Sequence, residues 1–502
     1  MHLRELTRFI SLVLLGLSAA GWSGCDQASP PANSAAVSSN SGKVPITTKS
    51  EQARSEFLQG RDLSDKLRAQ DSLPHFDQAI ALDPDFASAE LERANSSPTA
   101  KEFFEHLNKA VSLAEKASEG EKLLILANQA GANGDVTKQK DYLDRLVAAY
   151  PNDERAHFNL GTYYFGQQEM APAIEQYKQT AELAPNFSGT YNILGYAYRQ
   201  QADYANAEQA FKKYIELIPG DPNPYDSYAE LLLKMGKFDD SITQYKKALS
   251  IDSNFFASHF GMAADLMYLG KPDEAVAELQ TMAAQSRSDG ELRIALFGMA
   301  VVAADRGKLD QAVQEIDKEY AVAAKKDDVA AMAADLQAKG NILAQMPNYG
   351  EAQLQFDRSF EIIEASSLSQ EMKANATLLH HFNMAAIAIG KKDYAAARTH
   401  AEQFRQGAEA SKNPAQIKLA HELAGRIALA DKNYDQAIAE LEQANQQDPQ
   451  NSYRLYQAYQ AKGDAAKAQE YCTKAAGFNS LPQLNYAFVR GKAQKIAGGS
   501  KA

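Results

Sequence analysis

Cysteine is scarce in this chain. The 502 residues include only Cys25 and Cys472, so a disulfide framework is excluded and at most one bridge is available. Cys472 lies in a predicted helix beside Tyr471 and Ala475, and we expect a small buried apolar side chain rather than a reactive thiol. The fold must therefore depend on packing, for which 23 Tyr and 21 Phe supply ample aromatic volume.

Basic clusters and long apolar runs are also lacking. The formal net charge is -12 and no basic run interrupts it. An acidic surface repels phosphate backbones, so we expect no nucleic-acid partner. Beyond the first 24 residues no segment approaches the 18 consecutive apolar residues that suggest a membrane-spanning helix.

Sequence motifs of catalysis are missing too. The chain has no His-Glu-x-x-His motif of zinc proteases and no Gly-x-Ser-x-Gly nucleophile elbow. Its carboxylates are numerous but scattered, which is typical of solvated helix surfaces. The sequence therefore predicts no catalytic residues, no metal site and no cofactor.

The first 24 residues resemble a secretory signal. Arg4 and Arg8 make a basic start, and the apolar run 9–20 is too short to span a bilayer but suits a signal peptide. The sequence Trp-Ser-Gly-Cys at 22–25 resembles the lipobox of bacterial lipoproteins, which implies that Cys25 is acylated and becomes the mature N-terminus. Trp22 stands where that family usually has an aliphatic residue, so ordinary cleavage near residues 19–21 is the alternative.

Residues 25–50 follow as a predicted disordered tether. This stretch is rich in Ser, Ala, Pro and Asn and has almost no large apolar side chains, so it cannot offset the entropy of folding. A flexible chain of this length has a typical end-to-end distance of roughly 25–30 Å. We therefore expect a folded body held near a membrane surface by the lipid on Cys25.

An internal repeat organises the rest of the chain. Pro151, Pro185 and Pro219 are spaced by 34 residues, and the same period places repeat starts at Gly120, Glu154, Ser188, Pro222 and Phe256. Apolar residues recur at helical spacing in both halves of each repeat, with a turn between the halves. The pattern predicts a helix–turn–helix repeat, regular over residues 120–289.

Three positions in the repeat indicate how the two helices pack. The eighth is always small, as close helix crossing requires: Ala127, Gly161, Gly195, Ala229 and Ala263. The twentieth is small in four of five repeats: Gln139, Ala173, Ala207, Ser241 and Ala275. The twenty-fourth is always bulky: Leu143, Tyr177, Phe211, Tyr245 and Leu279.

These positions resemble the tetratricopeptide repeat. The resemblance covers about 51–480, and it implies an all-α, right-handed superhelical solenoid of about eleven or twelve repeats, irregular over 293–480. Further repeat starts are expected near Ala53, Arg293, Ala333, Leu378, Lys418 and Pro449, while the register within 86–118 stays open. Residues 365–373 and 405–416 are interpreted as insertions. Residues 481–502 are expected to form a capping helix and a frayed tail.

Recurrent polar residues fit the same repeat. His157, His259, His381 and His421 occupy its fourth position, where the family commonly has a large aromatic, so we interpret them as packing residues rather than metal ligands. The Gly-Lys pairs at 236, 270, 307 and 390 lack the other residues of a phosphate-binding loop and recur between the two helices. We expect them to be inter-helix turns.

The resemblance also implies a concave groove lined by the first helix of each pair. Large apolar side chains on an exposed groove are unfavourable without a partner, so they predict binding of an extended peptide or an amphipathic helix. The alternative is that they pack against neighbouring repeats or against a last helix lying in the groove. The candidate groove residues are Phe158, Asn159, Phe165, Ile193, Tyr196, Leu233, Phe260, Met267, Tyr268 and Phe297.

The sequence thus favours an exported, membrane-anchored scaffold that binds protein or peptide segments in the cell envelope, on the periplasmic side. It is not expected to be an enzyme. The alternatives are an enzyme or an enzyme-associated subunit with an unrecognised site in the irregular region 293–417, and a self-associating structural protein. The identity of the partner, the choice of membrane and the oligomeric state do not follow from the residues.

Overall fold

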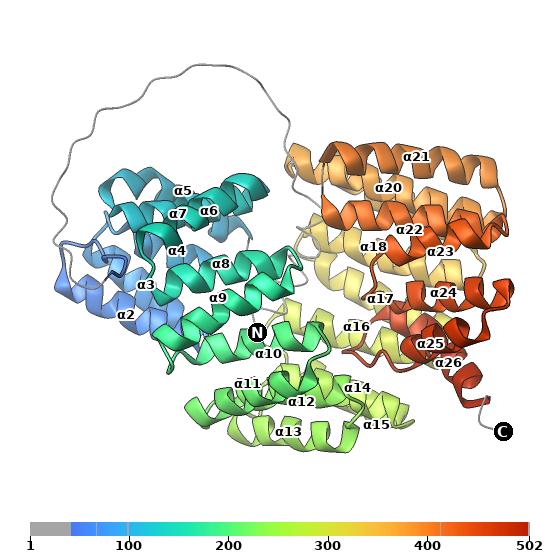
Figure 1. Cartoon of the computed structure of the whole chain (residues 1–502), viewed down its shortest axis with the longest axis horizontal. Coiled ribbons are helices and arrows are strands. Elements are labelled where there is room, and N and C mark those ends of the chain that lie inside the picture. Colours follow the sequence, from blue (N-terminus) through green and yellow to red (C-terminus); the bar gives the residue numbers. More distant parts are fainter. Residues whose placement is uncertain (1–41, 67, 98–99, 412, 500–502) are drawn as a thin grey trace. The chain divides into compact units, whose positions relative to one another are not determined.

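The computed structural model describes residues 42–66, 68–97, 100–411 and 413–499. Over these residues the chain forms 25 α-helices, α2 to α26, with one short 3-10 turn at Ala114–Lys116 and no strand (Figure 1). Twelve successive helix pairs and one final helix account for all of them, which confirms the predicted all-α solenoid class. The predicted signal peptide and Cys25 lie outside the described residues.

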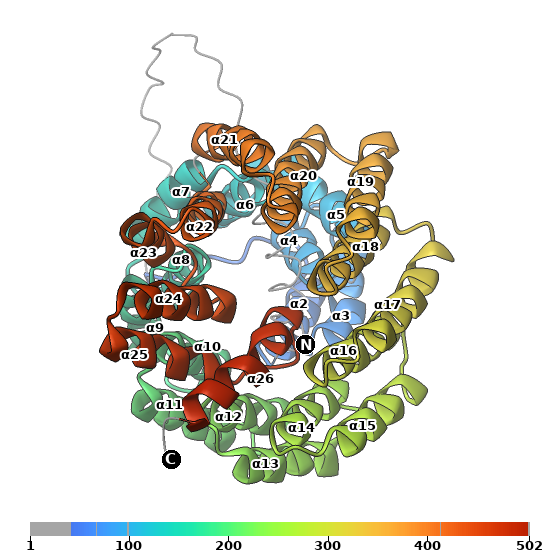
Figure 2. The same cartoon turned by 90° about the vertical axis from the view of Figure 1, so that its right-hand side faces the viewer.

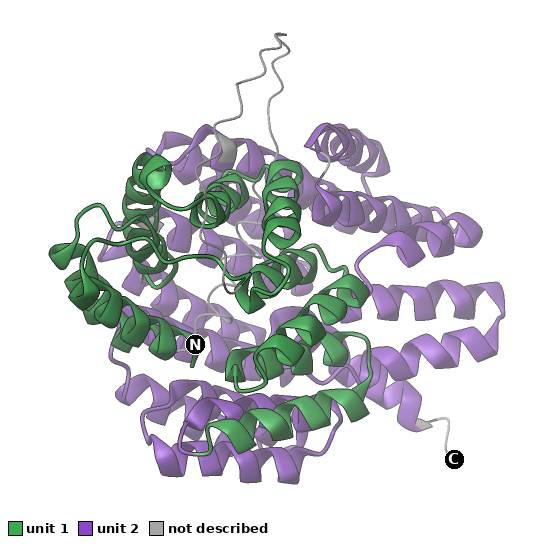
Figure 3. Cartoon of the chain, turned by 60° about the vertical axis from the view of Figure 1, so that its left-hand side comes forward, with its two compact units in different colours: residues 1–8, 17–219 green, residues 9–16, 220–502 purple. Residues whose placement is uncertain are grey.

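The helices belong to two compact units, divided after Pro219 (Figure 3). Five pairs, α2/α3 to α10/α11, form unit 1, in which each second helix packs on its first helix. Their bounds are α2 Glu51–Asp65, α3 Ala69–Leu82, α4 Ala87–Asn95, α5 Ala100–Leu113, α6 Glu119–Ala132, α7 Val136–Ala149, α8 Glu154–Gly166, α9 Met170–Leu183, α10 Ser188–Gln200 and α11 Tyr204–Leu217.

Unit 2 contains seven pairs, α12/α13 to α24/α25, and ends with α26. Their bounds are α12 Pro222–Lys234, α13 Phe238–Ile251, α14 Phe256–Tyr268, α15 Pro272–Ala284, α16 Asp289–Asp305, α17 Leu309–Ala324, α18 Val329–Gln345, α19 Tyr349–Ala365, α20 Gln370–Lys391, α21 Tyr394–Ser411, α22 Pro414–Ala430, α23 Tyr434–Gln443, α24 Pro449–Lys462, α25 Ala465–Ala476 and α26 Leu484–Gly499.

The small eighth position and the bulky twenty-fourth position of the repeat meet in the structure. A Cβ atom built on Gly161 would lie 2.7 Å from the ring of Tyr177, and one on Gly195 would lie 2.6 Å from the ring of Phe211. The same spacing of 16 residues joins Gly340 to Phe356, at 2.5 Å, in the irregular part of the chain. Because glycine has no side chain, the bulky ring of the second helix can lie directly against the backbone of the first helix.

Glycine turns join the two helices of several pairs. Gly236, Gly270 and Gly307 have φ of 75°, 75° and 73°, a left-handed conformation that glycine adopts without strain and that ends the first helix. The prediction for the fourth Gly-Lys pair was wrong. Gly390 lies inside α20, where an added Cβ would be 2.4 Å from the ring of Tyr349, and Lys392 takes the left-handed position instead, at φ 63°.

The stretches interpreted as insertions lengthen helices. Only residues 366–369 separate α19 from α20, which has 22 residues, and α21 extends to Ser411 before α22 begins at Pro414. In the stretch whose register was open, residues 87–95 and 100–113 form α4 and α5. No helix in the described part of the chain is long and apolar enough to cross a membrane.

Residues 42–49 form an extended segment that we call the strap. It is held on unit 1 rather than disordered, so the predicted tether boundary at residue 50 was wrong for this part. The backbone N–H groups of Val44, Thr47 and Lys49 donate hydrogen bonds of 2.8, 2.9 and 3.0 Å to three carboxylates at helix ends. The acceptors are Asp153, Glu121 and Asp83.

Apolar contacts complete the strap. Val44 packs with the core that includes Leu123 and Leu160, and Ile46 packs with the core around Phe57. An added Cβ on Gly120 would lie 2.8 Å from Val44, so this glycine leaves the space in which the strap sits. The strap thereby links the end of α3 to the starts of α6 and α8.

Candidate functional site

The ten predicted groove residues all lie on first helices of their pairs. Phe158, Asn159 and Phe165 are on α8, and Ile193 and Tyr196 are on α10, all in unit 1. The other five belong to unit 2. They are Leu233 on α12, Phe260, Met267 and Tyr268 on α14, and Phe297 on α16.

The unit 1 candidates pack largely among themselves and their neighbours. Phe158 stacks against Phe187 with ring centroids 5.0 Å apart, while Phe165 and the buried Ile193 belong to one apolar core. Asn159 donates a hydrogen bond to a carbonyl of its own helix. Tyr196 lies 5.2 Å from the ring of Phe211.

Half-buried aromatic and basic side chains remain on the same helices of unit 1. The guanidinium of Arg199 lies over the ring of Tyr196, 4.7 Å from its centroid, and both side chains are half-buried. Tyr163, Phe165 and Tyr198 share this intermediate exposure. Tyrosine and arginine are the residue types most enriched at the energetic centres of protein interfaces.

In unit 2 the candidates are covered by the protein itself. Leu233, Phe260 and Met267 are buried. Tyr268 donates a hydrogen bond to the carbonyl of Ser480, and Phe297 packs on a core to which α26 contributes. The last helix therefore lies against first helices of unit 2, as one alternative from the sequence anticipated, and α26 does more than cap the final pair (Figure 2).

This arrangement changes the argument for the groove. Large apolar side chains with substantial exposure do occur among the described residues, but no groove candidate is one of them: the exposed ones are Leu58, Leu82, Phe104, Val136, Leu354 and Met372. Contacts within the protein remove most of the cost of exposing these apolar side chains, so their presence does not by itself require a partner. Binding at the ten candidate positions stays a prediction, and in unit 2 it requires that α26 give way.

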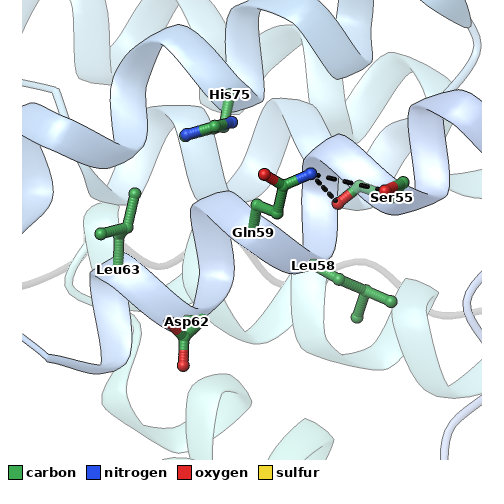
Figure 4. A pocket seen from close by; sticks show the side chains of 6 residues that line it. All are labelled: Ser55, Leu58, Gln59, Asp62, Leu63 and His75. Atoms are coloured by element: carbon green, nitrogen blue, oxygen red, sulfur yellow. Dashed lines mark hydrogen bonds between the residues drawn. The ribbon is translucent and has the colours of Figure 1, made fainter.

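A shallow cavity of about 500 Å³ lies on α2 and α3 (Figure 4). It is lined by Ser55, Leu58, Gln59, Asp62, Leu63 and His75. The amide of Gln59 turns to Ser55 of its own helix at 3.4 Å, and His75 pairs with Glu56 at 2.8 Å. Its polar groups are engaged along the helices instead of converging on one point, so the cavity offers no evident reactive centre.

Family models match three parts of the chain. A model described as protein kinase G tetratricopeptide repeat matches residues 192–295, and two described as tetratricopeptide repeat match residues 126–187 and 420–451. The matched segments contain the helix pairs described above. The chain is a tetratricopeptide-repeat protein. Repeats of this family typically bind protein partners, and the general role of a protein-interaction scaffold follows from the family.

Several solved structures resemble parts of this tetratricopeptide-repeat protein. A MamA protein is 21% identical over 34% of this chain and 94% of its own, with a TM-score of 0.30. A tetratricopeptide repeat protein from Parabacteroides merdae is 15% identical over 52% of this chain and 99% of its own, with a TM-score of 0.38. A MamA fragment from Desulfovibrio magneticus is 13% identical over 33% and 93%, with a TM-score of 0.30. No curated protein matches the sequence.

The histidines at the fourth repeat position bridge the two helices of their pairs. Each meets the residue 19 positions later through Nδ1: His157 with Gln176 at 2.8 Å, His259 with Glu278 at 2.9 Å, and His421 with Glu440 at 2.7 Å. These tetratricopeptide repeats thus use an imidazole where the family commonly has an aromatic. Among the described residues, no group of three or more His, Cys, Asp or Glu is arranged to hold a metal ion.

One repeat differs from this pattern. His381 faces another histidine, His400, with their Nδ1 atoms 3.2 Å apart, and His380 lies beside them. Burial lowers the pKa of His381, and the neighbouring His400 and His380 lower it further. Burial also lowers the pKa of His380, against the opposing effect of Asp357, whose carboxylate is 3.7 Å away.

Replacing His400 by glutamine, the residue that His157 faces, should make unit 2 less sensitive to acid. A histidine pKa lowered by folding means that the unfolded chain binds the proton more readily, so stability falls as the pH drops through the ordinary value near 6.5. His400→Gln removes one charge facing His380 and His381, and Asp357 and Glu361 on α19 remain. The loss of melting temperature between pH 7.5 and 5.5 should shrink relative to wild type.

Glu440→Gln is the matched control, because it changes the equivalent position opposite His421. It should not reduce the loss on acidification. An unchanged pH dependence in His400→Gln would show that the histidine pair contributes nothing to acid sensitivity.

The irregular region 293–417 contains one cluster of converging charges. Arg293 donates to Asp335 at 2.6 Å and to Glu319 at 3.3 Å, and both carboxylates are buried. Burial raises the pKa of Asp335 to about 6, although Arg293 opposes this shift. The adjoining cavity measures only about 90 Å³, well below the roughly 300–1,000 Å³ of small-molecule sites. A structural ion-pair network explains the cluster better than a catalytic centre.

Proposed function

We propose that this chain is a membrane-tethered scaffold whose unit 1 binds helical or peptide segments of other envelope proteins. The observation that carries the proposal is the half-buried aromatic and arginine surface on α8 and α10, centred on Tyr196 and Arg199. Tyrosine gives a large contact area at low entropic cost, and arginine is enriched at the energetic centres of interfaces. The family's general role in protein interaction supports the same reading.

The alternative of an enzyme in region 293–417 has less support. Arg293, Glu319 and Asp335 are engaged in ion pairs there, and the adjoining cavity measures only about 90 Å³. A scaffold requires no such site.

Affinity capture from cross-linked membrane extracts tests the binding surface. Wild-type chain should recover a defined set of proteins, and Tyr196→Ala should lose most of it. Tyr204→Ala is the control, since this tyrosine is also half-buried but lies on the second helix α11. Equal recovery by both variants and the wild type would refute the assignment to α8 and α10.

The anchor rests on the lipobox resemblance at residues 22–25. Mass spectrometry of the mature N-terminus should find an acylated Cys25, and Cys25→Ser should release the chain from the membrane fraction. A Cys25→Ser chain that stays with the membrane would count against the lipid anchor.

A further inference from the structure

The C-terminal segment, residues 478–496, lies along the first helices of unit 2 as a ligand would. It contacts residues of α12 and α14 at its start, and α26 then packs on α16, α18 and α24 as well as on α25 (Figure 2). Lys234 reaches Phe478 from 244 positions earlier in the sequence. The segment therefore spans helix pairs far beyond its nearest neighbour in the chain.

Polar contacts fix the start of the segment. Lys234 donates to the carbonyl of Phe478, and its ammonium lies 3.9 Å from the centroid of the Phe478 ring. Tyr268 donates to the carbonyl of Ser480. Backbone carbonyls bound by side chains are a mode of recognition that any peptide could satisfy.

Apolar contacts fix the middle. Leu484 and Phe488, four residues apart on one face of α26, are buried in a core with side chains from α16, α17 and α18. The side chains that receive them include Ala300, Ala304, Ile316 and Ile342. Small and branched side chains here form the kind of apolar groove that accepts the face of an amphipathic helix.

A buried ion pair fixes the end. Arg490 donates two hydrogen bonds to Asp305, one of them 2.6 Å long, and its guanidinium lies 5.3 Å from the centroid of the Tyr268 ring. The Asp305 side chain is only 4% exposed and that of Arg490 12%. A carboxylate this buried needs a cationic partner, so whatever covers Asp305 must bring one.

The helix itself is weakly built compared with these contacts. Gly491 lies in its middle, and nothing lies within 4 Å of a Cβ added there. Glycine inside a helix is less favourable than alanine because the unfolded backbone is freer. Among the described residues, α26 is the one helix that does not belong to a pair. Its place is held by side-chain contacts of the type found between proteins.

We propose that the surface of unit 2 lined by Lys234, Tyr268, Ile342 and Asp305 is a docking site for a helix of a partner protein, and that α26 is its resident occupant. The partner helix carries two apolar side chains four residues apart and an arginine or lysine two residues later, matching Leu484, Phe488 and Arg490. The partner helix displaces α26, and its basic side chain replaces Arg490 in the ion pair with Asp305. The inference rests on the proposed scaffold function and adds a second, guarded surface to it.

A labelled peptide of residues 478–497 tests the proposal on the full chain. Wild-type chain should bind it weakly, because α26 occupies the surface. The double variant Phe488→Ala with Arg490→Gln should loosen α26 and bind the same peptide at least tenfold more tightly. Adding Asp305→Asn should abolish most of that gain. Lys492→Ala, an exposed residue of the same helix, should behave as wild type.

A folded double variant that binds the peptide no better than wild type would overturn the proposal. Hydrogen exchange of the wild-type chain gives a second reading that needs no variant: α26 amides should exchange faster than those of α16. Exchange of both helices only through global unfolding would also overturn it. A double variant that dimerises with wild type through exchanged α26 helices would refute a foreign partner as the occupant.

The test separates this inference from the proposed function. Tight peptide binding without any recovered envelope protein would leave the docking site standing and remove the scaffold role. Recovery of partners that depends on Tyr196 alone, with no peptide binding, would support the scaffold role and remove the docking site on unit 2.

Discussion

Replacing Gly340 by alanine should lower the free energy of unfolding of unit 2 by about 1–3 kcal/mol, the usual range for overpacking a tight core. The new methyl group would lie 2.5 Å from the Phe356 ring, and that ring is buried between α18 and α19. Neither helix can move without disturbing its neighbours in the stack. Alanine's better helix propensity, up to about 1 kcal/mol, offsets only part of the strain.

Gly350→Ala is the matched control for that experiment. It lies on the second helix of the same pair, and nothing stands within 4 Å of its added Cβ. Chemical denaturation should leave its stability unchanged or slightly raised. If Gly340→Ala proves as stable as Gly350→Ala, the close crossing at the eighth repeat position is not required.

Arg293→Met should cost about 3–5 kcal/mol of stability at pH 7.5, because it leaves two buried carboxylates without their cation. Asp335 and Glu319 are 4% and 7% exposed, and Arg293 bridges α16 to both. The pKa of Asp335, about 6, is raised above its ordinary value by burial. The folded state therefore favours the protonated form of Asp335. The stability that this protonated carboxyl contributes is lost as the pH rises through about 6.

The pH dependence of Arg293→Met follows from that sign. At pH 5, below the pKa of about 6, Asp335 is mostly protonated, so the variant should lose less stability than at pH 7.5. Arg306→Met is the comparison, since Arg306 pairs at 2.8 Å with a far more exposed Asp273, and it should cost under about 1 kcal/mol at either pH. Equal losses for the two arginines in thermal and urea unfolding would argue against a buried network.

Much of the repeat architecture was predictable because it depends on local spacing. The small eighth position identified where the two helices cross closely, and Gly161 does lie at such a crossing. That the bulky twenty-fourth position, here Tyr177, meets it is shown by the structure. The turn at Gly390 was mistaken because a Gly-Lys pair suits both a turn and a close helix crossing. Only the ring of Tyr349 distinguishes the two, and it lies on another helix.

The candidate site was harder to predict because distant segments decide its exposure. Phe260 and Met267 have the repeat positions of groove residues, but repeat position alone does not say what covers them. Residues 481–502 were expected to form a capping helix and a frayed tail, and the spacing of Leu484 and Phe488 is compatible with several surfaces. The polar signal was available in Arg490 and Asp305, yet a pair 185 positions apart is not visible without the fold.

The strap was missed for a different reason. Residues 42–49 combine four polar side chains with Gly42 and Pro45, a composition that is typical of disordered chain. Their order comes from backbone N–H groups that meet carboxylates at helix ends, and composition does not reveal such contacts. Val44 and Ile46 were the available clue.

The strap also determines how a pull on the N-terminal side would be carried. Traction applied ahead of residue 42 would first load the bonds of Lys43 and Val44 to the start of α8. It would then load the bond of Thr47 to α6, and last the bond of Lys49 to the end of α3. Helix α2 begins only beyond these bonds, at Glu51. The strap's hydrogen bonds and ion pair would thus bear the tension one after another before it could unwind α2.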